Sequence, residues 1–434
     1  MGTPLFQLPH TQSYYAATAK YPQRYPELTE AITVDVCIVG GGLSGINCAL
    51  ELAQRGYSVA LLEANKIGWG ASGRNGGELI RGIGHGIEQF TNQIGREGVD
   101  AINQMGVEAV QIVKDRVDEF NIDCDLVMGY CDLALKPSHM KELQEDFDSL
   151  AESGYPHETR MLSKADLSEV IGSERYIGGM LDMGSGHLHP LNLVTGEAVA
   201  AASLGVQLFE DSPAVEIQKG TKPLVKTPNG QVTCSYVLLA GNAYIGNKLE
   251  PYVGGKVLPA GSYIIATEPL SDEQVASTIP KNMSFADLSI ALDYYHLSGD
   301  NRLLFGGLCT YSGKDPRDIT AALLPNLERV FPQLKGVNID FEWGGMIGIG
   351  ANRLPQIGTL PDAPNIFYAQ AYSGHGLNAT HMAGRVVAEA ISGTAERFDV
   401  FAKVKHMTFP GGPLLRSPLL AIGMTYYKIL EALQ

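Results

Sequence analysis

Three glycines near the N-terminus are spaced as G-x-G-x-x-G: Gly40, Gly42 and Gly45. They follow an apolar run at residues 34–39 that predicts a buried strand, and they open a helix expected from about Leu43 to Arg55. In this setting the glycines permit a tight turn, close approach of a phosphate to the backbone, and packing of helix on strand. The free N–H groups and the dipole at the helix start favour an anion. The motif therefore predicts a bound dinucleotide.

A carboxylate supports this prediction. The run YSVALLE predicts a second strand that ends at Glu63, 23 positions after Gly40. A carboxylate at that strand end can accept hydrogen bonds from an adenosine ribose. The strand, helix and strand together make a nucleotide-binding unit near the N-terminus.

A second polar, glycine-rich loop follows at residues 71–77, ASGRNGG. Ser72, Arg74, Asn75 and Gly76 offer a hydroxyl, a guanidinium, an amide and bare backbone just beyond the adenosine-binding strand. Two such loops suit an extended FAD better than NAD, because the isoalloxazine ring of FAD reaches into another domain.

The stretch YSGHGLNATHMAGR provides a matching distal contact. Gly374 and Gly376 permit close backbone approach, and a helix starting near Leu377 aims its positive end at a ligand. Such a helix end can stabilise negative charge at the N1–C2=O edge of a reduced flavin. His375 stands between the two glycines, where packing gives a side chain little reason to be, so we expect it to contact the flavin or its pocket.

The remaining pattern predicts two kinds of domain. Strand, turn and helix units occur at both ends of the chain, and hairpin-like strands lie between them, one hairpin turning at residues 298–301. This order predicts a nucleotide-binding domain interrupted by a second, mixed-sheet domain. Helical spacing is seen at 108–120 and 140–154, and strands are expected at 126–137, 261–270 and 302–309.

Composition and charge exclude several classes of protein. The 434 residues are 45% hydrophobic and 18% charged, as in an ordinary globular protein. The net charge of −15 argues against a nucleic-acid partner, which requires a basic surface. The six scattered cysteines contain no CxxC pair, so we expect reduced thiols, no metal site and a cytoplasmic setting. The apolar tail at 417–427 is too short to span a bilayer, and a packed or interfacial helix is expected there.

The motifs VDVCIVGGGLSG, LLEANKIGWGASGRNGG and YIIATEPL resemble those of the D-amino-acid oxidase and glycine/sarcosine oxidase superfamily of FAD enzymes. The segments GHLHPLNLVTG, DYYHLSGDNRLLFGG and FPGGPLLRSPLLAIGMTYYKI are similar to those of gamma-glutamylputrescine oxidoreductases within it. The resemblance runs nearly end to end.

This resemblance implies a mixed α/β fold with a discontinuous, Rossmann-like FAD-binding domain and a substrate domain built on a mostly antiparallel sheet. We expect the FAD-binding domain at 33–85, 190–250 and 345–395, the substrate domain at 86–189 and 251–344, and a C-terminal helical tail at 396–434. The resemblance also places the backbone of Val215 near the adenine and Gly241 beside the dinucleotide. A covalent flavin link is not expected, because no cysteine lies in a suitable motif.

The implied reaction is oxidation of a carbon–nitrogen bond, with hydride transfer from the carbon to flavin N5. The resulting imine can hydrolyse to an aldehyde, and molecular oxygen or another acceptor then takes the electrons. Because the cofactor carries the redox chemistry, no side chain is assigned as a catalytic residue. An alkyl amine with a pKa of ~10.4 must lose its proton before its lone pair can assist.

Candidates for the substrate pocket come from two segments. Tyr294, Tyr295 and His296 are consecutive on an expected strand, so Tyr295 faces away from the other two. They either form an aromatic wall for an aliphatic amine or are ordinary sheet residues. His187 and His189 either orient the substrate or fasten a turn before Pro190.

One departure from the superfamily concerns substrate choice. In its amino-acid-oxidising branches an arginine after the WxG strand clamps the substrate carboxylate. Here Gly348, Ile349 and Gly350 stand in that region, and Arg353 comes later, either contacting a distal carboxylate or serving a structural role. This favours gamma-glutamylputrescine or a related polyamine derivative over a D-amino acid, glycine or sarcosine. A flavoprotein scaffold without turnover is the alternative from another class.

Overall fold

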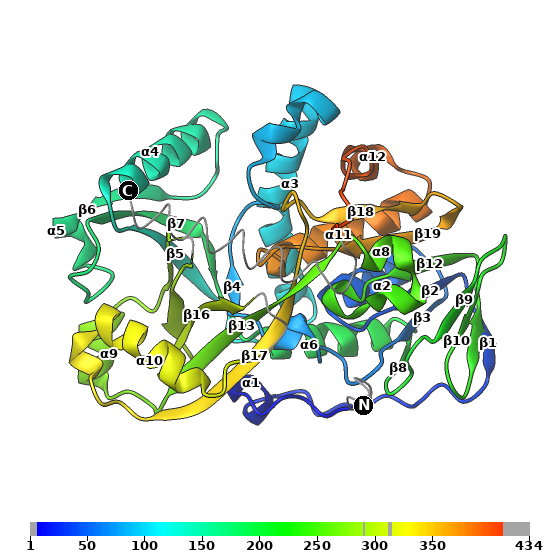
Figure 1. Cartoon of the computed structure of the whole chain (residues 1–434), viewed down its shortest axis with the longest axis horizontal. Coiled ribbons are helices and arrows are strands. Elements are labelled where there is room, and N and C mark those ends of the chain that lie inside the picture. Colours follow the sequence, from blue (N-terminus) through cyan, green and yellow to red (C-terminus); the bar gives the residue numbers. More distant parts are fainter. Residues whose placement is uncertain (1–6, 290, 311–314, 411–434) are drawn as a thin grey trace.

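The computed structural model describes residues 7–289, 291–310 and 315–410 (Figure 1). Within these residues the strands form sheets of six, nine and four strands. The fold is a mixed α/β fold of the kind expected from the sequence. All of the expected tail beyond residue 410 lies outside the described residues.

The six-stranded sheet has the order β18-β19-β12-β2-β3-β8 and is parallel except for β18. All residues of β2 and β3 are buried, as in parallel strands covered on both faces. Helices α2 (Leu43–Gln54), α6 (Pro190–Ser203) and α11 (Leu377–Ile391) contact this sheet and one another. The strands are β2 (Val36–Val39), β3 (Val59–Leu62), β8 (Gln207–Phe209), β12 (Tyr236–Leu239), β18 (Gln356–Leu360) and β19 (Ala363–Gln370).

The nine-stranded sheet has the order β17-β13-β16-β15-β14-β5-β7-β4, with β6 paired to β7. It is antiparallel except where β14 meets β5. Its strands are β4 (Glu78–Leu79), β5 (Val127–Ala134), β6 (Thr159–Ser163), β7 (Gly178–His187), β13 (Leu258–Thr267), β14 (Ser284–Asp287), β15 (Tyr294–Leu297), β16 (Leu303–Thr310) and β17 (Ile339–Ile349).

Helices cover the outer parts of this sheet (Figure 1). Helix α10 (Ile319–Val330) contacts β13, β16 and β17, and α4 (Pro137–Glu152) contacts β5, β6 and β7. The remaining helices are α1 (Tyr14–Ala17), α3 (Thr91–Glu119), α5 (Lys164–Leu167), α7 (Gly246–Leu249), α8 (Pro251–Gly254), α9 (Asp272–Thr278) and α12 (Glu396–Ala402), with short 3-10 turns such as η1 (Ala71–Gly73).

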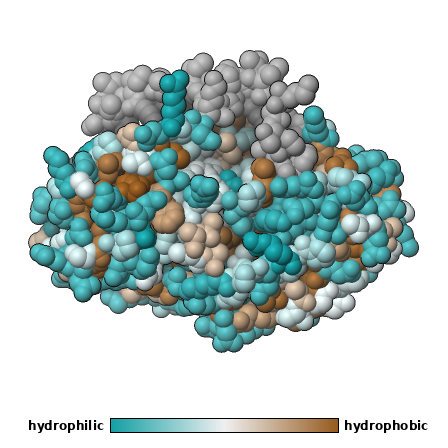
Figure 2. All heavy atoms as spheres, turned by 90° about the horizontal axis from the view of Figure 1, so that it is seen from below, coloured by the Kyte–Doolittle hydropathy of each residue, from teal (hydrophilic) through white to brown (hydrophobic). Residues whose placement is uncertain are grey.

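A small four-stranded sheet, β1-β11-β10-β9, lies beside the parallel sheet in Figure 1. Its strands are β1 (Ala31–Thr33), β9 (Glu216–Gln218), β10 (Leu224–Lys226) and β11 (Gln231–Thr233). On the face drawn in Figure 2, hydrophilic side chains predominate among the described residues and hydrophobic ones are scattered. This surface fits the strongly acidic composition.

The strand, helix and strand unit expected at the N-terminus is confirmed as β2, α2 and β3. The hairpin is also confirmed, because Ser298 N donates to Arg302 O at 2.9 Å between β15 and β16. Helix α6 and strand β7 were not expected. Strand β4 joins the nine-stranded sheet although residues 33–85 were assigned to the FAD-binding segment, and the division into domains remains a prediction.

Tyr295 lies on the opposite face of β15 from Tyr294 and His296, as alternation requires. It is fully buried, its ring stacks on Phe305 at 5.4 Å, and its hydroxyl donates to the Tyr176 hydroxyl at 2.9 Å. This is the position of an ordinary sheet residue in the core.

We expect Tyr295→Ala to lower the free energy of unfolding by about 3 to 5 kcal/mol, because it leaves a large cavity. Tyr295→Phe, which keeps the ring and loses the hydrogen bond, should lower it by only about 1 kcal/mol. Urea unfolding followed by circular dichroism measures both. Equal effects of the two variants would contradict the packing described here.

Candidate functional site

The turn between β2 and α2 is built so that only glycine fits. Gly40 has φ +117°, and a Cβ there would lie 2.7 Å from the carbonyl oxygen of Ala240. A Cβ on Gly45 would lie 2.0 Å from the carbonyl oxygen of Gly40, so α2 packs directly against the turn. Gly241 is close to the same turn, because its backbone nitrogen would lie 3.1 Å from a Cβ on Gly40.

Helix α2 begins after Gly42. Because glycine has no side chain, the N-cap position itself supplies no hydrogen bond to the first turn of the helix. Leu43 N donates to Ser72 Oγ at 2.9 Å, which brings the 71–77 loop against the helix start. A Cβ on Gly42 would lie 2.7 Å from that hydroxyl oxygen. Gly42 is only partly buried at this positive end of the helix dipole, and the remaining backbone N–H groups there fit a phosphate group.

Glu63 follows β3 and reaches the same turn. Its Oε2 accepts a hydrogen bond from Gly41 N at 2.7 Å, and its Oε1 accepts one from Asn65 N at 2.9 Å. Burial raises the pKa of the Glu63 carboxyl, and the backbone donors oppose this shift. The carboxylate is thus held beside the glycine turn, where the sequence places a ribose.

Arg74 and Asn75 shape the loop that carries them. The Arg74 guanidinium lies over the Trp69 ring, 4.2 Å from its centroid, and Nε donates to the Trp69 carbonyl at 2.7 Å. Burial lowers the pKa of Arg74. Asn75 Oδ1 accepts from Gly77 N at 2.8 Å, which fixes the turn. A Cβ on Gly76 would lie 2.5 Å from the Tyr294 ring, so this loop meets the nine-stranded sheet at β15.

The second glycine turn precedes α11. Gly374 has φ +89°. Gly376 is the N-cap residue of α11, which begins at Leu377, and as a glycine it supplies no side-chain cap. The His375 Nε2 lies 3.2 Å from the Gly82 carbonyl oxygen, and burial lowers the pKa of the imidazole. Asn378 Nδ2 donates to the same carbonyl at 2.7 Å. Helix α11 therefore also presents bare backbone N–H groups.

The other candidates are spread over several places. Val215 is 55% exposed, and its N–H donates to Lys226 O at 2.8 Å. His189 accepts from Asn192 N at 3.1 Å and caps α6, so it fastens the turn before Pro190. Arg353 is exposed with φ +59°. Burial first, and the Arg353 charge second, lower the pKa of His85 to about 3.

Tyr294 and His296 share the face of β15 that meets the 71–77 loop. His296 Nε2 lies 2.8 Å from the Gly76 carbonyl oxygen, and its ring stands 4.4 Å from that of His187. Burial lowers the pKa of both imidazoles. His187 and His296 help to line a cavity of about 250 Å³. The other lining residues are Tyr14, Tyr15, Asp125, Leu126, Val127, Leu188, His189, Asn282, Leu297, Ser298, Gly299 and Leu304.

Two carboxyl groups were missed by the sequence reasoning, Glu78 and Asp132. Burial raises the pKa of Glu78 well above its ordinary value, and its Oε1 is buried with no hydrogen-bond partner among the described residues. Burial raises the pKa of Asp132 to about 6, against the opposing effects of a 2.6 Å hydrogen bond from the Tyr130 hydroxyl and the Arg81 charge. The available signal for Glu78 was its place directly after the double glycine of the loop.

Among residues 7–289, 291–310 and 315–410, no cluster of three or more His, Cys, Asp and Glu side chains could hold a metal ion. No helix there is both long and apolar enough to cross a bilayer.

Comparison with known proteins agrees with this geometry. Residues 35–390 match the family described as FAD dependent oxidoreductase, and the chain belongs to that family. The glycine turns, Glu63 and the two helix starts fit its cofactor, FAD.

The chain is 42% identical to gamma-glutamylputrescine oxidoreductase of Escherichia coli (strain K12), over 98% of this chain and 99% of that protein. It is 40% identical to a probable oxidoreductase, OrdL, of Haemophilus influenzae (strain ATCC 51907 / DSM 11121 / KW20 / Rd), over 97% of each chain. The crystal structure of glycine oxidase from Geobacillus kaustophilus has the same fold, with a TM-score of 0.72 and 22% identity, over 87% of this chain and all of that chain.

We expect Gly45→Ala to raise the dissociation constant of FAD by about a hundredfold, because the new Cβ forces α2 away from the Gly40 turn. Gly220→Ala is the matched control, since a Cβ there meets no atom within 4 Å. Reconstitution of the apoprotein, followed by flavin fluorescence, measures both. Normal FAD binding by the Gly45 variant would contradict the tight turn.

Asp132→Asn tests the buried carboxyl. Because the folded-state pKa of Asp132 is raised to about 6, its contribution to stability is complete below pH ~4 and is lost as pH rises through about 6. We therefore expect the wild-type Tm to fall relative to that of Asp132→Asn between pH 4.5 and 7. Asp35→Asn should show no such change between pH 4.5 and 7, because hydrogen bonds from Ser58 lower the pKa of Asp35 and its contribution to stability is lost only at more acidic pH. A Tm difference for Asp132→Asn that does not vary with pH would refute the raised pKa.

Proposed function

We propose that this protein oxidises the carbon–nitrogen bond of an alkyl amine, with gamma-glutamylputrescine or a related polyamine derivative as its substrate. The name of the Escherichia coli relative supports this choice, because the similarity covers nearly the whole of both chains. Bound FAD supplies the acceptor, N5, for a hydride from the carbon that bears nitrogen. The imine product then hydrolyses to an aldehyde.

The observation that carries the choice of an amine is the end of β17. Gly348, Ile349 and Gly350 place no guanidinium there. A Cβ on Gly348 would lie 2.1 Å from Asn242 Oδ1, so a larger residue does not fit at that position. A carboxylate beside the reacting carbon would therefore find no bidentate arginine partner at these three positions, the partner that favours α-amino acids.

The residues proposed to receive the amine lie where the 71–77 loop meets β15. Tyr294 supplies an apolar ring against which an aliphatic chain can pack. Glu78 follows that loop, and its Oε1, which has no partner among the described residues, can accept a hydrogen bond from the amine. Burial disfavours charge at this place, which helps the amine to lose its proton before the hydride leaves.

We expect anaerobic addition of gamma-glutamylputrescine to bleach the flavin absorption band at about 450 nm. D-amino acids, glycine and sarcosine should reduce the flavin at least about a hundredfold more slowly, because they lack a partner for their carboxylate. Stopped-flow absorbance measures each rate. Reduction by the α-amino acids alone would support an amino-acid oxidase instead, and reduction by none of the compounds would support a scaffold without turnover.

The setting and the final electron acceptor are further parts of the proposal. The six scattered cysteines, expected to be reduced thiols, fit a cytoplasmic enzyme. Molecular oxygen or another acceptor would take the electrons from the reduced flavin and complete each turnover.

A further inference from the structure

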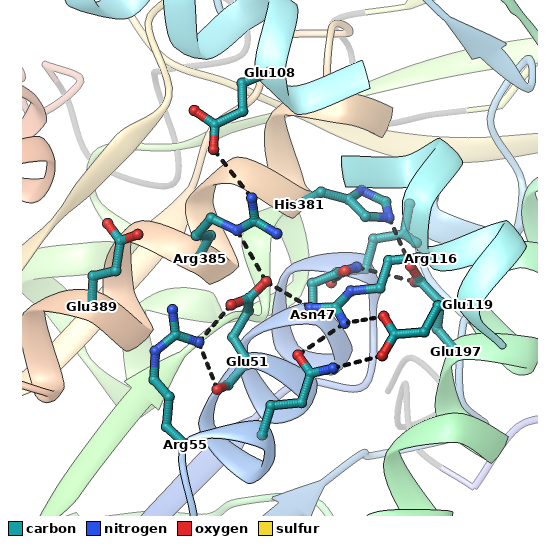
Figure 3. Close-up of polar contacts among 12 residues, drawn as sticks. Asn47, Glu51, Arg55, Glu108, Arg116, Glu119, Glu197, His381, Arg385 and Glu389 are labelled. Atoms are coloured by element: carbon teal, nitrogen blue, oxygen red, sulfur yellow. Dashed lines mark hydrogen bonds and ion pairs between the residues drawn. The ribbon is translucent and has the colours of Figure 1, made fainter. Parts of the chain in front are cut away.

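Glu197 on α6 lies between α2 and α11, the two helices that begin at the glycine turns (Figure 3). Its side chain is fully buried. Glu197 Oε1 lies 2.8 Å from Nε2 of His381 on α11, and Oε2 accepts a hydrogen bond at 3.0 Å from Nδ2 of Asn47 on α2. One carboxylate therefore joins the two helices.

Each partner of Glu197 also holds the first residue of its own helix. Asn47 Nδ2 donates a second hydrogen bond, at 2.9 Å, to the carbonyl oxygen of Leu43, where α2 begins. His381 Nδ1 lies 2.7 Å from the carbonyl oxygen of Leu377, where α11 begins. The contacts thus run continuously from one helix start to the other.

The imidazole of His381 stands between two oxygen atoms, and both contacts are hydrogen bonds only if protons lie on both sides of the ring. One proton is on Nδ1 and faces Leu377 O, and the other lies between Nε2 and Glu197. Without an acceptor or donor at position 197, the buried Nε2 and the Asn47 amide would each lose a partner. Such losses are costly in the interior, so the arrangement depends on Glu197.

We propose that Glu197 is a positioning residue for FAD, which sets the start of α2 relative to the start of α11. The pyrophosphate is expected at the first helix start and the isoalloxazine ring at the second. Because one dinucleotide must meet both in a single bound conformation, a displacement between them weakens one set of contacts. This inference concerns the cofactor and does not depend on which amine is oxidised.

The test compares Glu197→Leu with Glu197→Gln. A glutamine amide can donate to His381 Nε2 and accept from Asn47, so it keeps the contacts that leucine abolishes. We expect the dissociation constant of FAD to rise about tenfold or more in Glu197→Leu and to stay within about threefold of the wild-type value in Glu197→Gln. Reconstitution of apoprotein with FAD measures both.

Glu108→Gln is the matched control. Glu108 forms ion pairs with Arg385 on α11 and with Arg397 on α12, at 3.1 and 2.8 Å, and these contacts lie away from Leu43 and Leu377. Glu108→Gln therefore removes charged contacts to α11 and α12 away from the start of α11. We expect its FAD dissociation constant and reduction potential to equal those of the wild type.

Two further variants separate the two arms and remain informative if Glu197→Leu does not fold. Asn47→Leu releases the start of α2, so it should weaken FAD binding and leave the reduction potential unchanged. His381→Phe releases the start of α11, which stabilises the reduced flavin, so it should lower the potential. A tenfold loss of preference for the reduced form corresponds to about 30 mV for this two-electron couple.

Circular dichroism of the apoproteins establishes that each variant is folded. The proposal is supported by the affinity loss in Glu197→Leu with recovery in Glu197→Gln, or by the split between Asn47→Leu and His381→Phe. It is overturned if the folded variants bind FAD with wild-type affinity and potential. It is equally overturned if Glu108→Gln changes both quantities as much as they do. No amine is added, so the result is independent of the proposed substrate.

Discussion

The central constraint that we propose for this fold is that two helix starts, those of α2 and α11, face one FAD molecule. Helices α2 and α11 begin at Leu43 and Leu377, directly after Gly42 and Gly376, which carry no side chain that could cap them. Ser72 Oγ accepts from the Leu43 N–H, and the other N–H groups of the first turns remain for a ligand. Backbone N–H groups in such a position need another partner, and a cofactor with a pyrophosphate at one end and an electron-rich ring at the other can serve both helices. This requirement explains why glycine occupies the turns before them.

The two large sheets meet this requirement in different ways. The parallel sheet carries β2, β12 and β19 side by side, which brings the turn after β2 next to Gly241 and to the segment that leads into α11. The nine-stranded sheet approaches from the other side, where β4 continues the 71–77 loop and Tyr294 packs on Gly76. The expected ring of the cofactor and the expected amine thus lie where the sheets come together.

Features encoded in short stretches of sequence could be predicted. The glycine turn, Glu63, the hairpin at 298–301 and the opposite orientation of Tyr295 follow from local spacing and alternation, and the structure contains them. His189 was ambiguous, because only the structure shows that its ring accepts from Asn192 N and caps α6.

Features that join distant segments could not be predicted from spacing. Glu197 and His381 are 184 positions apart, and nothing in either local sequence indicates that they form a buried pair. The burial of Glu78 and Asp132 likewise depends on how β4, β5 and the surrounding elements pack, since each residue alone reads as an ordinary surface carboxylate. Local motifs therefore predict the two ends of the proposed FAD site, and only the fold shows the contacts that join them.

A crystal structure of the protein purified with its flavin would show directly whether one FAD joins the two helix starts. We expect electron density for one FAD per chain, with its pyrophosphate against the N–H groups at the start of α2 and the N1–C2=O edge of its ring at the start of α11. A flavin bound elsewhere, or one that leaves either helix start facing only solvent, would contradict it.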